Sequence, residues 1–419
     1  MTVLRSKKVA KQLSLLDIRG IAQLVTEATV GVTGIVEGVH HSVLSTMCIP
    51  GSATAGQTCG ITGLVYKSIR HTTQLVGKSI DTALAILEPL FESVKYTNPE
   101  TPQREALLAI INGVIGDYLV VNNNPLAIPM TLRYQGKALN LDSHSLPTIQ
   151  ETKSKVLLLI HGLCMNDLQW HTQHKGQTVN HGEALACALN YTPIYLRYNS
   201  GLHTSQNGRE LSIHLERLFR HWPKPIEELI VVAYSMGGLL IRSAFHYAKQ
   251  ENLRWTNYLK SIAFLGTPHH GSPLEKAGNW IDTILGSTRY SAPFAKLGKV
   301  RSAGITDLRY GYLLDEDWLG YERFDCKPDN RQFVPLPEGI ACYTIAATIT
   351  DKRNIMADCL IGDGLVPLYS ALGQHNDVKR NLGFAKAAQW IAYHTNHKQL
   401  LSSPDVTRQM IEWLMPVQV

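Results

Sequence analysis

The chain has 419 residues, of which 44% are hydrophobic and 18% charged, and its formal net charge is +6. This composition excludes a wholly disordered chain, a coiled coil and a collagen-like chain, because a large core can form and glycine and proline occur at ordinary levels. A charge of +6 spread over 419 residues is too dilute to indicate a nucleic-acid binder. At about 150 residues per domain, the length suggests two or three domains.

The seven cysteines are widely spaced and include no Cys-x-x-Cys pair, so they predict neither a zinc site nor a disulfide framework. We expect reduced thiols in a reducing compartment. The basic N-terminus lacks the apolar stretch of a secretory signal, and no run of about 18 apolar residues predicts a transmembrane helix. The sequence therefore predicts a cytoplasmic protein, and peripheral attachment to a membrane stays open.

Residues 1–122 are predicted to form a helical N-terminal region. Apolar residues recur every three or four positions from Ile18 to Val43 and again from Ile61 to Leu87, with turn-forming residues between the two segments. This pattern predicts an antiparallel pair of amphipathic helices. Thr101-Pro102 predicts the start of a third helix, which runs to about residue 118.

Two interpretations of this helical region stay open. It is either a domain that packs on the rest of the chain, or an element that binds a membrane surface or a partner protein. The first twenty residues carry five basic side chains against one acidic one, which suits anionic lipid headgroups. The many Thr, Ser and His residues of the helices argue against the membrane.

From residue 123 to residue 419, strands alternate with helices. A β-hairpin is predicted over 128–141, and helices over 208–222 and 237–249. Continuous apolar runs separated by helices predict a buried, mostly parallel sheet. These runs are 156–160, 193–198, 229–233, 261–265 and 342–347.

The stretch from about 272 to 339 interrupts this alternation and contains nine aromatic residues. An insertion of this length and composition predicts a lid over a binding site. The alternative is that the aromatic side chains only pack the insertion against the sheet.

A serine lies where one predicted strand runs directly into a helix, in Ala233-Tyr234-Ser235-Met236-Gly237. Only small residues fit two positions before and two after a serine on such a tight turn, because the strand and the helix crowd it. The turn exposes the hydroxyl at a helix N-terminus, where partial positive charge favours a developing oxyanion. The usual first residue is glycine, and alanine is the next smallest. Ser235 is therefore the candidate nucleophile.

The loop His161-Gly162-Leu163 follows an earlier strand and predicts the second half of an oxyanion hole. We assign its two donors to the backbone N–H groups of Leu163 and Met236. Each such donor contributes about 3 kcal/mol of transition-state stabilisation. His161 itself is interpreted as a structural histidine.

A serine nucleophile needs a base, and the base needs an acid that orients it. After a strand-to-helix turn of this kind, which we call the elbow, the acid precedes the histidine in the chain. Asp363, in a glycine-flanked turn, and His397, before a terminal helix, satisfy this order. Asp351 is the alternative acid and His394 the alternative base. Either replacement leaves the class of chemistry unchanged.

Together these motifs resemble an α/β-hydrolase of the lipase and esterase type, over about residues 127–419. The run Gly-Thr-Pro-His-His-Gly-Ser-Pro at 266–273 is similar to bacterial triacylglycerol lipases and to deacylases of glycosylphosphatidylinositol anchors. In such families the aspartate of an Asp-Gly-Leu-Val-Pro turn is the acid, so the resemblance favours Asp363. His269 and His270 are interpreted as structural.

The expected architecture is an α/β-hydrolase fold with a mostly parallel central sheet, an inserted lid region and an N-terminal helical extension. The expected activity is hydrolysis of carboxylic esters, lipid-like acyl esters in view of the aromatic insertion, through an acyl-enzyme intermediate. An acyltransferase with the same triad, and a scaffold or membrane-binding protein with a silent hydrolase domain, are the alternatives. No metal, organic cofactor or nucleic-acid partner is expected, and nothing indicates the oligomeric state.

Overall fold

The structure is a computed structural model that describes residues 15–46, 64–75, 78, 81, 101–141, 152–272, 301–320, 328–351 and 362–415. The chain divides into two compact units, which are Met1–Arg104 with Leu119–Ala127, and Glu105–Tyr118 with Ile128–Val419. The predicted third helix is α4 (Pro102–Val121), and it contributes residues to both units. Of the five basic residues among the first twenty, Arg19 is described and the other four lie outside the described residues.

The first unit contains the long helix α2 (Leu15–Thr46), which extends about three residues beyond the predicted segment at each end, and a helix over 64–75, which lies within the second predicted segment. Arg19 Nε lies 2.6 Å from Asp81 Oδ1, and Arg70 pairs with Glu37. The first pair joins the start of the first segment to the end of the second, and the other joins the later part of the first to the earlier part of the second, which is the order of an antiparallel pair. Among the described residues, no helix is both long and apolar enough to cross a bilayer.

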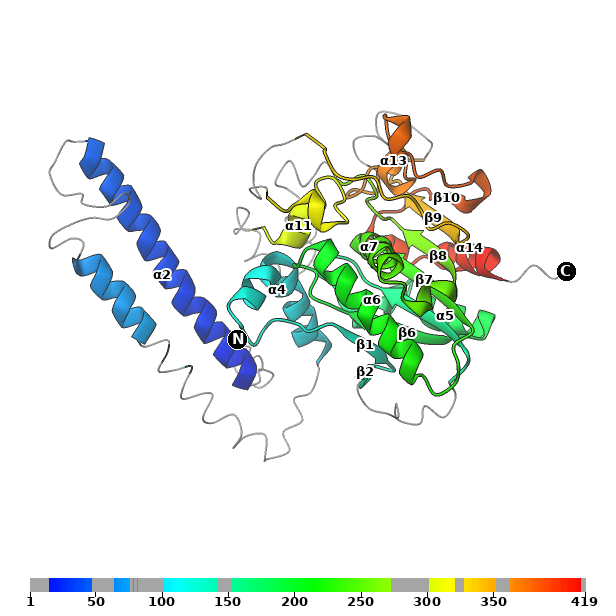
Figure 1. Ribbon diagram of the computed structural model, residues 1–419, viewed down its shortest axis with the longest axis horizontal. Helices are drawn as coiled ribbons and strands as arrows, with labels where there is room; N and C mark the ends of the chain where they lie inside the picture. Colours follow the sequence, from blue (N-terminus) through cyan, green and yellow to red (C-terminus); the bar gives the residue numbers. More distant parts are fainter. Residues whose placement is uncertain are drawn as a thin grey trace. The chain divides into compact units, whose positions relative to one another are not determined.

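The second unit is built on an eight-stranded sheet in the order β10-β9-β8-β7-β3-β6-β1-β2 (Figure 1). The neighbours from β10 to β6 pair in parallel, whereas β1 runs antiparallel to both β6 and β2. The strands are β1 (Thr131–Tyr134), β2 (Lys137–Ala138), β3 (Lys155–Ile160), β6 (Thr192–Arg197), β7 (Glu228–Tyr234), β8 (Leu259–Leu265), β9 (Ala341–Ala347) and β10 (Gln389–Ala392).

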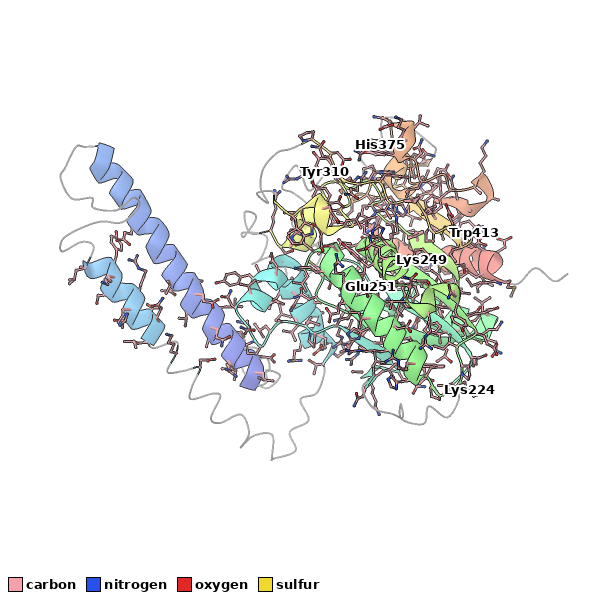
Figure 2. The ribbon with its side chains drawn as sticks, viewed as in Figure 1. Lys224, Lys249, Glu251, Tyr310, His375 and Trp413 are labelled. Atoms are coloured by element: carbon pink, nitrogen blue, oxygen red, sulfur yellow. The ribbon has the colours of Figure 1, made fainter. Side chains whose placement is uncertain are left out.

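Helices cover both faces of this sheet, which is why its central strands are apolar without interruption. Because successive side chains of a strand point to opposite faces, Leu158 packs in one cluster with α6 (Thr204–His221) and α7 (Met236–Gln250). Leu157 and Leu159 pack in the other, with α5 (His181–Leu189) and α14 (Pro404–Leu414). Trp413, labelled in Figure 2, stacks from α14 on a β9 tyrosine with ring centroids 5.0 Å apart.

The predicted α/β-hydrolase fold is confirmed, and the five predicted parallel strands and the helices α6 and α7 lie at the predicted places. The sequence analysis missed β10, the nine-residue α5, and a small antiparallel hairpin of β4 (Thr172–His174) and β5 (Gln177–Val179). The predicted hairpin of β1 and β2 turns at Gln135-Gly136, where both residues have positive φ, 47° and 76°. Two such residues in succession are typical of a type I′ turn.

The insertion is described over 301–320 and 328–339, whereas 273–300 and 321–327 lie outside the described residues. Its helix α11 (Ala303–Asp307) and the following turn bury Ile305, Leu308 and Leu313 in one cluster with Met236 at the start of α7. Trp318 stacks on His203 with ring centroids 3.7 Å apart. The described part of the insertion is therefore packed onto the body of the unit, and its role as a lid stays a prediction.

Candidate active site

Ser235 lies on the turn between β7 and α7, in the backbone conformation that the sequence pattern implies. Its φ is 54° and its ψ is −125°, which for a residue with a side chain costs on the order of 1–3 kcal/mol. Two hydrogen bonds hold the turn. The Ser235 N–H donates to Leu265 O at 2.8 Å, and Ser235 O accepts from the Gly238 N–H at 3.0 Å.

The small residues around Ser235 are explained by direct contacts. A Cβ on Gly237 would lie 2.7 Å from the carbonyl oxygens of Ile160 and His161, so the helix could not approach β3 as closely. Ala233 is fully buried within β7, between Ile160 of β3 and Phe264 of β8. Its methyl group points to one face of the sheet and lies in the apolar cluster that contains Leu158, so the position that is usually glycine accommodates an alanine here.

The structure brings Ser235, His397 and Asp363 together in one line of hydrogen bonds. His397 Nε2 lies 2.8 Å from Ser235 Oγ, and His397 Nδ1 lies 2.6 Å from Asp363 Oδ2. The three residues come from the β7–α7 turn, from the loop after β10 and from a turn after β9. All three are buried, with exposed fractions of 6%, 6% and 1%.

The Asp363 carboxylate is fixed by its own turn. Its Oδ1 accepts hydrogen bonds from the backbone N–H groups of Leu365 at 2.9 Å and Val366 at 2.8 Å, which leaves Oδ2 for His397. The backbone N–H of His397 donates to Asp363 O at 2.9 Å, so main chain and side chains hold the two residues together. Gly362 and Gly364 flank the aspartate with φ values of 51° and 93°.

The rival acid and base lie elsewhere. Asp351 and His394 approach each other to 3.5 Å, but their side chains are 82% and 68% exposed. Neither forms a hydrogen bond with Ser235 among those that the described residues make. Exposure leaves them free to rotate in water, whereas His397 is fixed on both nitrogens.

His161 is a buried structural histidine in this fold. Its ring stacks on Tyr198 with centroids 4.3 Å apart, and its Nδ1 lies 2.8 Å from the carbonyl oxygen of Gly162. Burial lowers the pKa of His161 to about 4, so the ring is neutral at pH 7. A neutral ring in this loop adds no charge beside the nucleophile.

The two backbone groups assigned to an oxyanion hole flank the nucleophile. Met236 is the first residue of α7, where a backbone N–H has no partner within the helix. The loop before Leu163 passes directly beside the serine, because a Cβ on Gly162 would lie 3.0 Å from Ser235 Cβ. In the part of the chain that the structure describes, the Leu163 N–H donates no hydrogen bond, whereas the next N–H, of Cys164, donates to Ser200 Oγ at 3.0 Å.

Tyr234 is a site residue that sequence reasoning did not single out. Its hydroxyl donates to the His397 carbonyl oxygen at 3.1 Å, and the two rings lie 4.9 Å apart. Burial, together with the Asp363 charge, raises the pKa of Tyr234 well above its usual value, so it stays a donor. Its place beside Ser235 was the available signal, but only the fold shows that its ring turns toward the histidine loop.

This arrangement can activate a hydroxyl. A neutral His397 with Nδ1–H directed at Asp363 presents an Nε2 lone pair to Ser235 Oγ, and the carboxylate stabilises the imidazolium that results. Among the described residues, no group of three His, Cys, Asp or Glu side chains is placed to hold a metal ion. The chemistry that the described site supports is attack of a serine oxygen on an electrophilic centre.

No protein-family model and no curated protein matches the sequence. Solved structures similar to this chain include a mature lipase from Bacillus licheniformis, at 17% identity and a TM-score of 0.40, covering 64% of this chain and 94% of that one. A lipase from Staphylococcus hyicus matches at 14% identity and a TM-score of 0.38, and the match covers 64% of this chain and 96% of that one. The structure of EstA from Clostridium botulinum matches at 14% identity and a TM-score of 0.36, and the match covers 73% of this chain and 97% of that one. These likenesses are too loose to say what this chain does, so its function has to be argued from the site itself.

Proposed function

We propose that this protein is a serine hydrolase that cleaves carboxylic esters. The observation that carries the proposal is the continuous hydrogen-bonded line from Asp363 through His397 to Ser235, with distances of 2.6 Å and 2.8 Å. A serine hydroxyl, a histidine base and a buried carboxylate in this order form the arrangement that activates a serine for acyl transfer.

The proposed reaction has two stages. His397 Nε2 takes the Ser235 proton as Oγ attacks the acyl carbonyl, and the same nitrogen then gives that proton to the departing alcohol. A water molecule, deprotonated by His397, attacks the acyl-enzyme. The bond from the acyl carbon to Ser235 Oγ then breaks, His397 returns the proton to Oγ, and the carboxylic acid leaves. The N–H groups of Leu163 and Met236 donate to the oxyanion in both stages, each contributing about 3 kcal/mol.

We further propose that the acyl group is apolar and lipid-like. The residues next to the reacting centre support this, because Leu163 and Met236 are buried in one apolar cluster with Leu239 and with Ile305 of the insertion. An acyl chain that packs against this apolar cluster is stabilised by the area removed from water, at about 25 cal/mol per Å².

The test is hydrolysis of a chromogenic ester series of increasing acyl length by the wild type and by Ser235→Ala. We expect the wild type to hydrolyse the esters and the variant to lose activity by a factor on the order of 10³ or more. Ser402→Ala, which removes an exposed hydrogen bond to Gln399 O, is the matched control and keeps full activity.

Undiminished hydrolysis by Ser235→Ala would sink the proposal. A preference for short acyl groups would contradict the lipid-like substrate while leaving the reaction class in place. Product analysis with added glycerol separates hydrolysis from transfer to an alcohol, because only transfer makes a new ester.

A further inference from the structure

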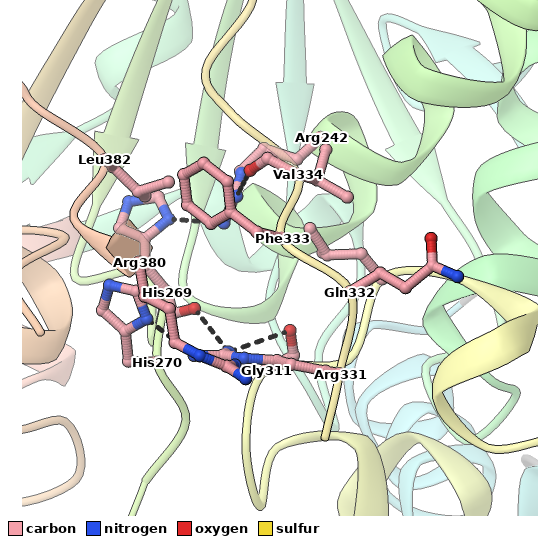
Figure 3. A pocket seen from close by; sticks show the side chains of 11 residues that line it. Arg242, His269, His270, Gly311, Arg331, Gln332, Phe333, Val334, Arg380 and Leu382 are labelled. Carbon is pink, nitrogen blue, oxygen red and sulfur yellow. Dashed lines mark hydrogen bonds between the residues drawn. The ribbon is translucent and has the colours of Figure 1, made fainter. Parts of the chain in front are cut away.

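A second polar site lies in a small hollow that is partly open to solvent (Figure 3). Four segments meet there, namely α7, the loop after β8, the insertion and the loop after α13 (Leu368–Ala371). Its charged and titratable lining residues are Arg242, His269, His270, Arg331 and Arg380. None of the residues that line it belongs to the triad or to the loop of Leu163.

Arg242 is a buried cation without a carboxylate partner among the described residues. Its side chain donates to Val334 O and lies 3.3 Å from His269 Nδ1, while its Nε has no partner there. The residue is only 4% exposed, and burial, followed by the charge of Arg331, lowers its pKa to about 9. A guanidinium in this position is costly unless an anion reaches it.

Arg331 and Arg380 add two more guanidinium groups but share one acid. Asp329 Oδ1 lies 3.3 Å from Arg331 Nε and 3.2 Å from Arg380 Nη1. Asp377 approaches Arg380 only to 3.9 Å and is 53% exposed. Among the described residues, Arg331 and Arg380 therefore share one carboxylate, Arg242 pairs with none, and a second acid approaches only Arg380.

A further acid near this cluster within the described part of the insertion is already engaged. Asp317 accepts hydrogen bonds from the backbone N–H groups of Leu313, Leu314 and Gln332, at 2.9 to 3.0 Å. It lowers the charge around Arg331 without lining the pocket. The lining residues thus keep an excess of positive charge.

The two histidines contribute polar groups without adding charge. Arg331 Nη2 donates to His270 Nδ1 at 2.7 Å, and Arg331 Nη1 donates to His269 O at 3.0 Å. Burial, and then Arg331, lowers the pKa of His270 to about 3, and the pKa of His269 lies well below its usual value for the same first reason. Because His269 Nδ1 faces a donor, its proton lies on Nε2, which has no acceptor among the described residues.

We propose that this pocket is a binding site for a phosphate group. Guanidinium groups bind phosphate oxygens through pairs of parallel N–H donors, and three of them from different segments suit a tetrahedral anion better than a planar carboxylate. The anion supplies the negative charge that Arg242 lacks. It also links α7 to the insertion through Arg331 and to the loop after α13 through Arg380.

The first test is calorimetric titration of the wild-type protein with inorganic phosphate at constant ionic strength. Inorganic phosphate carries no carboxylic ester, so no turnover disturbs the measurement. We expect saturable binding that Arg380→Gln weakens about tenfold, the loss of one charged hydrogen-bonded pair. Arg209→Gln is the matched control, because Arg209 also pairs with the insertion, 2.7 Å from Asp315, but does not line the pocket.

A second variant separates a loss of phosphate binding from a loss of folding. Arg242→Lys keeps the buried charge and removes the planar fork, so it weakens phosphate binding while thermal unfolding stays cooperative. Phosphate binding that is unchanged in both Arg380→Gln and Arg242→Lys, or acetate that binds as tightly as phosphate, would overturn the proposal. So would a wild-type protein that is folded and binds no phosphate.

The phosphate could be free or part of a lipid headgroup, and a kinetic experiment separates these two sources. This experiment alone rests on the proposed esterase function, so its failure leaves the calorimetric result standing. With Ser235 intact, a headgroup site predicts that Arg380→Gln raises KM about tenfold for dihexanoylphosphatidylglycerol and leaves KM for dihexanoylglycerol unchanged. Equal KM values, together with phosphate binding that depends on Arg380, identify the ligand as a free phosphate or a soluble phosphate ester.

Discussion

The two units of the chain treat their apolar residues in opposite ways. In the sheet unit Leu158 and Trp255 are completely buried, as are most of the aliphatic residues of β3, β7 and β8. In the helical unit Leu64 is 71% exposed and Val25 is 60% exposed. Part of the apolar pattern that predicted the helices is therefore turned to solvent.

Both units contain ion pairs, but apolar burial contributes a smaller share to the stability of the helical unit. The helical unit is tied by ion pairs, such as Arg104 Nε to Asp17 Oδ2 at 2.6 Å, in addition to its packing. The sheet unit buries apolar area on both faces of one sheet, which is the largest favourable term in folding. An amphipathic pattern predicts a helix, but it does not say what covers the apolar face, and the two interpretations of the helical region stay predictions.

The largest expected effect is a loss of activity on substitution of the triad acid, which lies in the sheet unit. Asp363→Asn should lower kcat by a factor of about 10³ to 10⁴, because an amide cannot hold His397 in the productive tautomer. Asp351→Asn, in the exposed rival acid, is the control and should stay near the wild-type rate. A large loss in the control, with Asp363→Asn active, would transfer the acid role to Asp351.

The next effect tests the difference in burial. Leu158→Ala removes a fully buried side chain from the middle of β3 and should lower the free energy of unfolding by about 2–5 kcal/mol. Leu64→Ala, in the exposed position of the helical unit, should change it by less than about 0.5 kcal/mol. Urea unfolding followed by circular dichroism measures both, and equal losses would remove the contrast between the units.

Acid should destabilise the sheet unit through its buried neutral histidines. Burial lowers the pKa of both His161 and His181 to about 4. Unfolded histidine titrates near 6.5, so the unfolded state binds more protons between these values. The stabilisation is complete above about pH 6.5 and is lost as pH falls toward 4, by about 3 kcal/mol for each histidine. His181→Gln should flatten the fall of the melting temperature between pH 7 and 5, and an unchanged slope would contradict this.

The smallest effect belongs to the ion pairs of the helical unit. Arg19→Gln removes the partner whose hydrogen bond is the largest cause of the lowered pKa of Asp81. We expect a loss of about 0.2–1 kcal/mol that shrinks in high salt, because both side chains are partly exposed. Arg408→Gln breaks a more exposed pair in α14 and serves as the control. A loss of several kcal/mol would show that the helical unit depends on charges far more than the comparison implies.

The central strands and the elbow were predictable because their signals are local. The run 229–233 is buried on both faces, and the small residues around Ser235 follow from contacts with the strand beside it. The edge strand β10 has four residues and only one buried side chain, so its sequence carries little periodic signal. The short helix α5 was missed for the same reason of length.

Separating the candidate acids and bases required the tertiary structure. Asp351 and Asp363 both follow β9, and His394 and His397 are three residues apart, so chain order cannot choose between them. Burial and hydrogen bonding distinguish them once the fold is known. The arginine pocket was beyond local reasoning altogether, since Arg242, Arg331 and Arg380 lie on segments that only the sheet topology brings together.

The positive φ of Ser235 lowers the stability of the fold, whereas the serine itself is needed for catalysis. Glycine adopts φ near +54° without the steric cost that a serine bears there, on the order of 1–3 kcal/mol. Ser235→Gly should therefore melt at a higher temperature than the wild type while losing the nucleophile. Laboratory evolution that selects this chain for thermostability alone would favour inactive descendants, so a useful selection has to score catalysis in the same round.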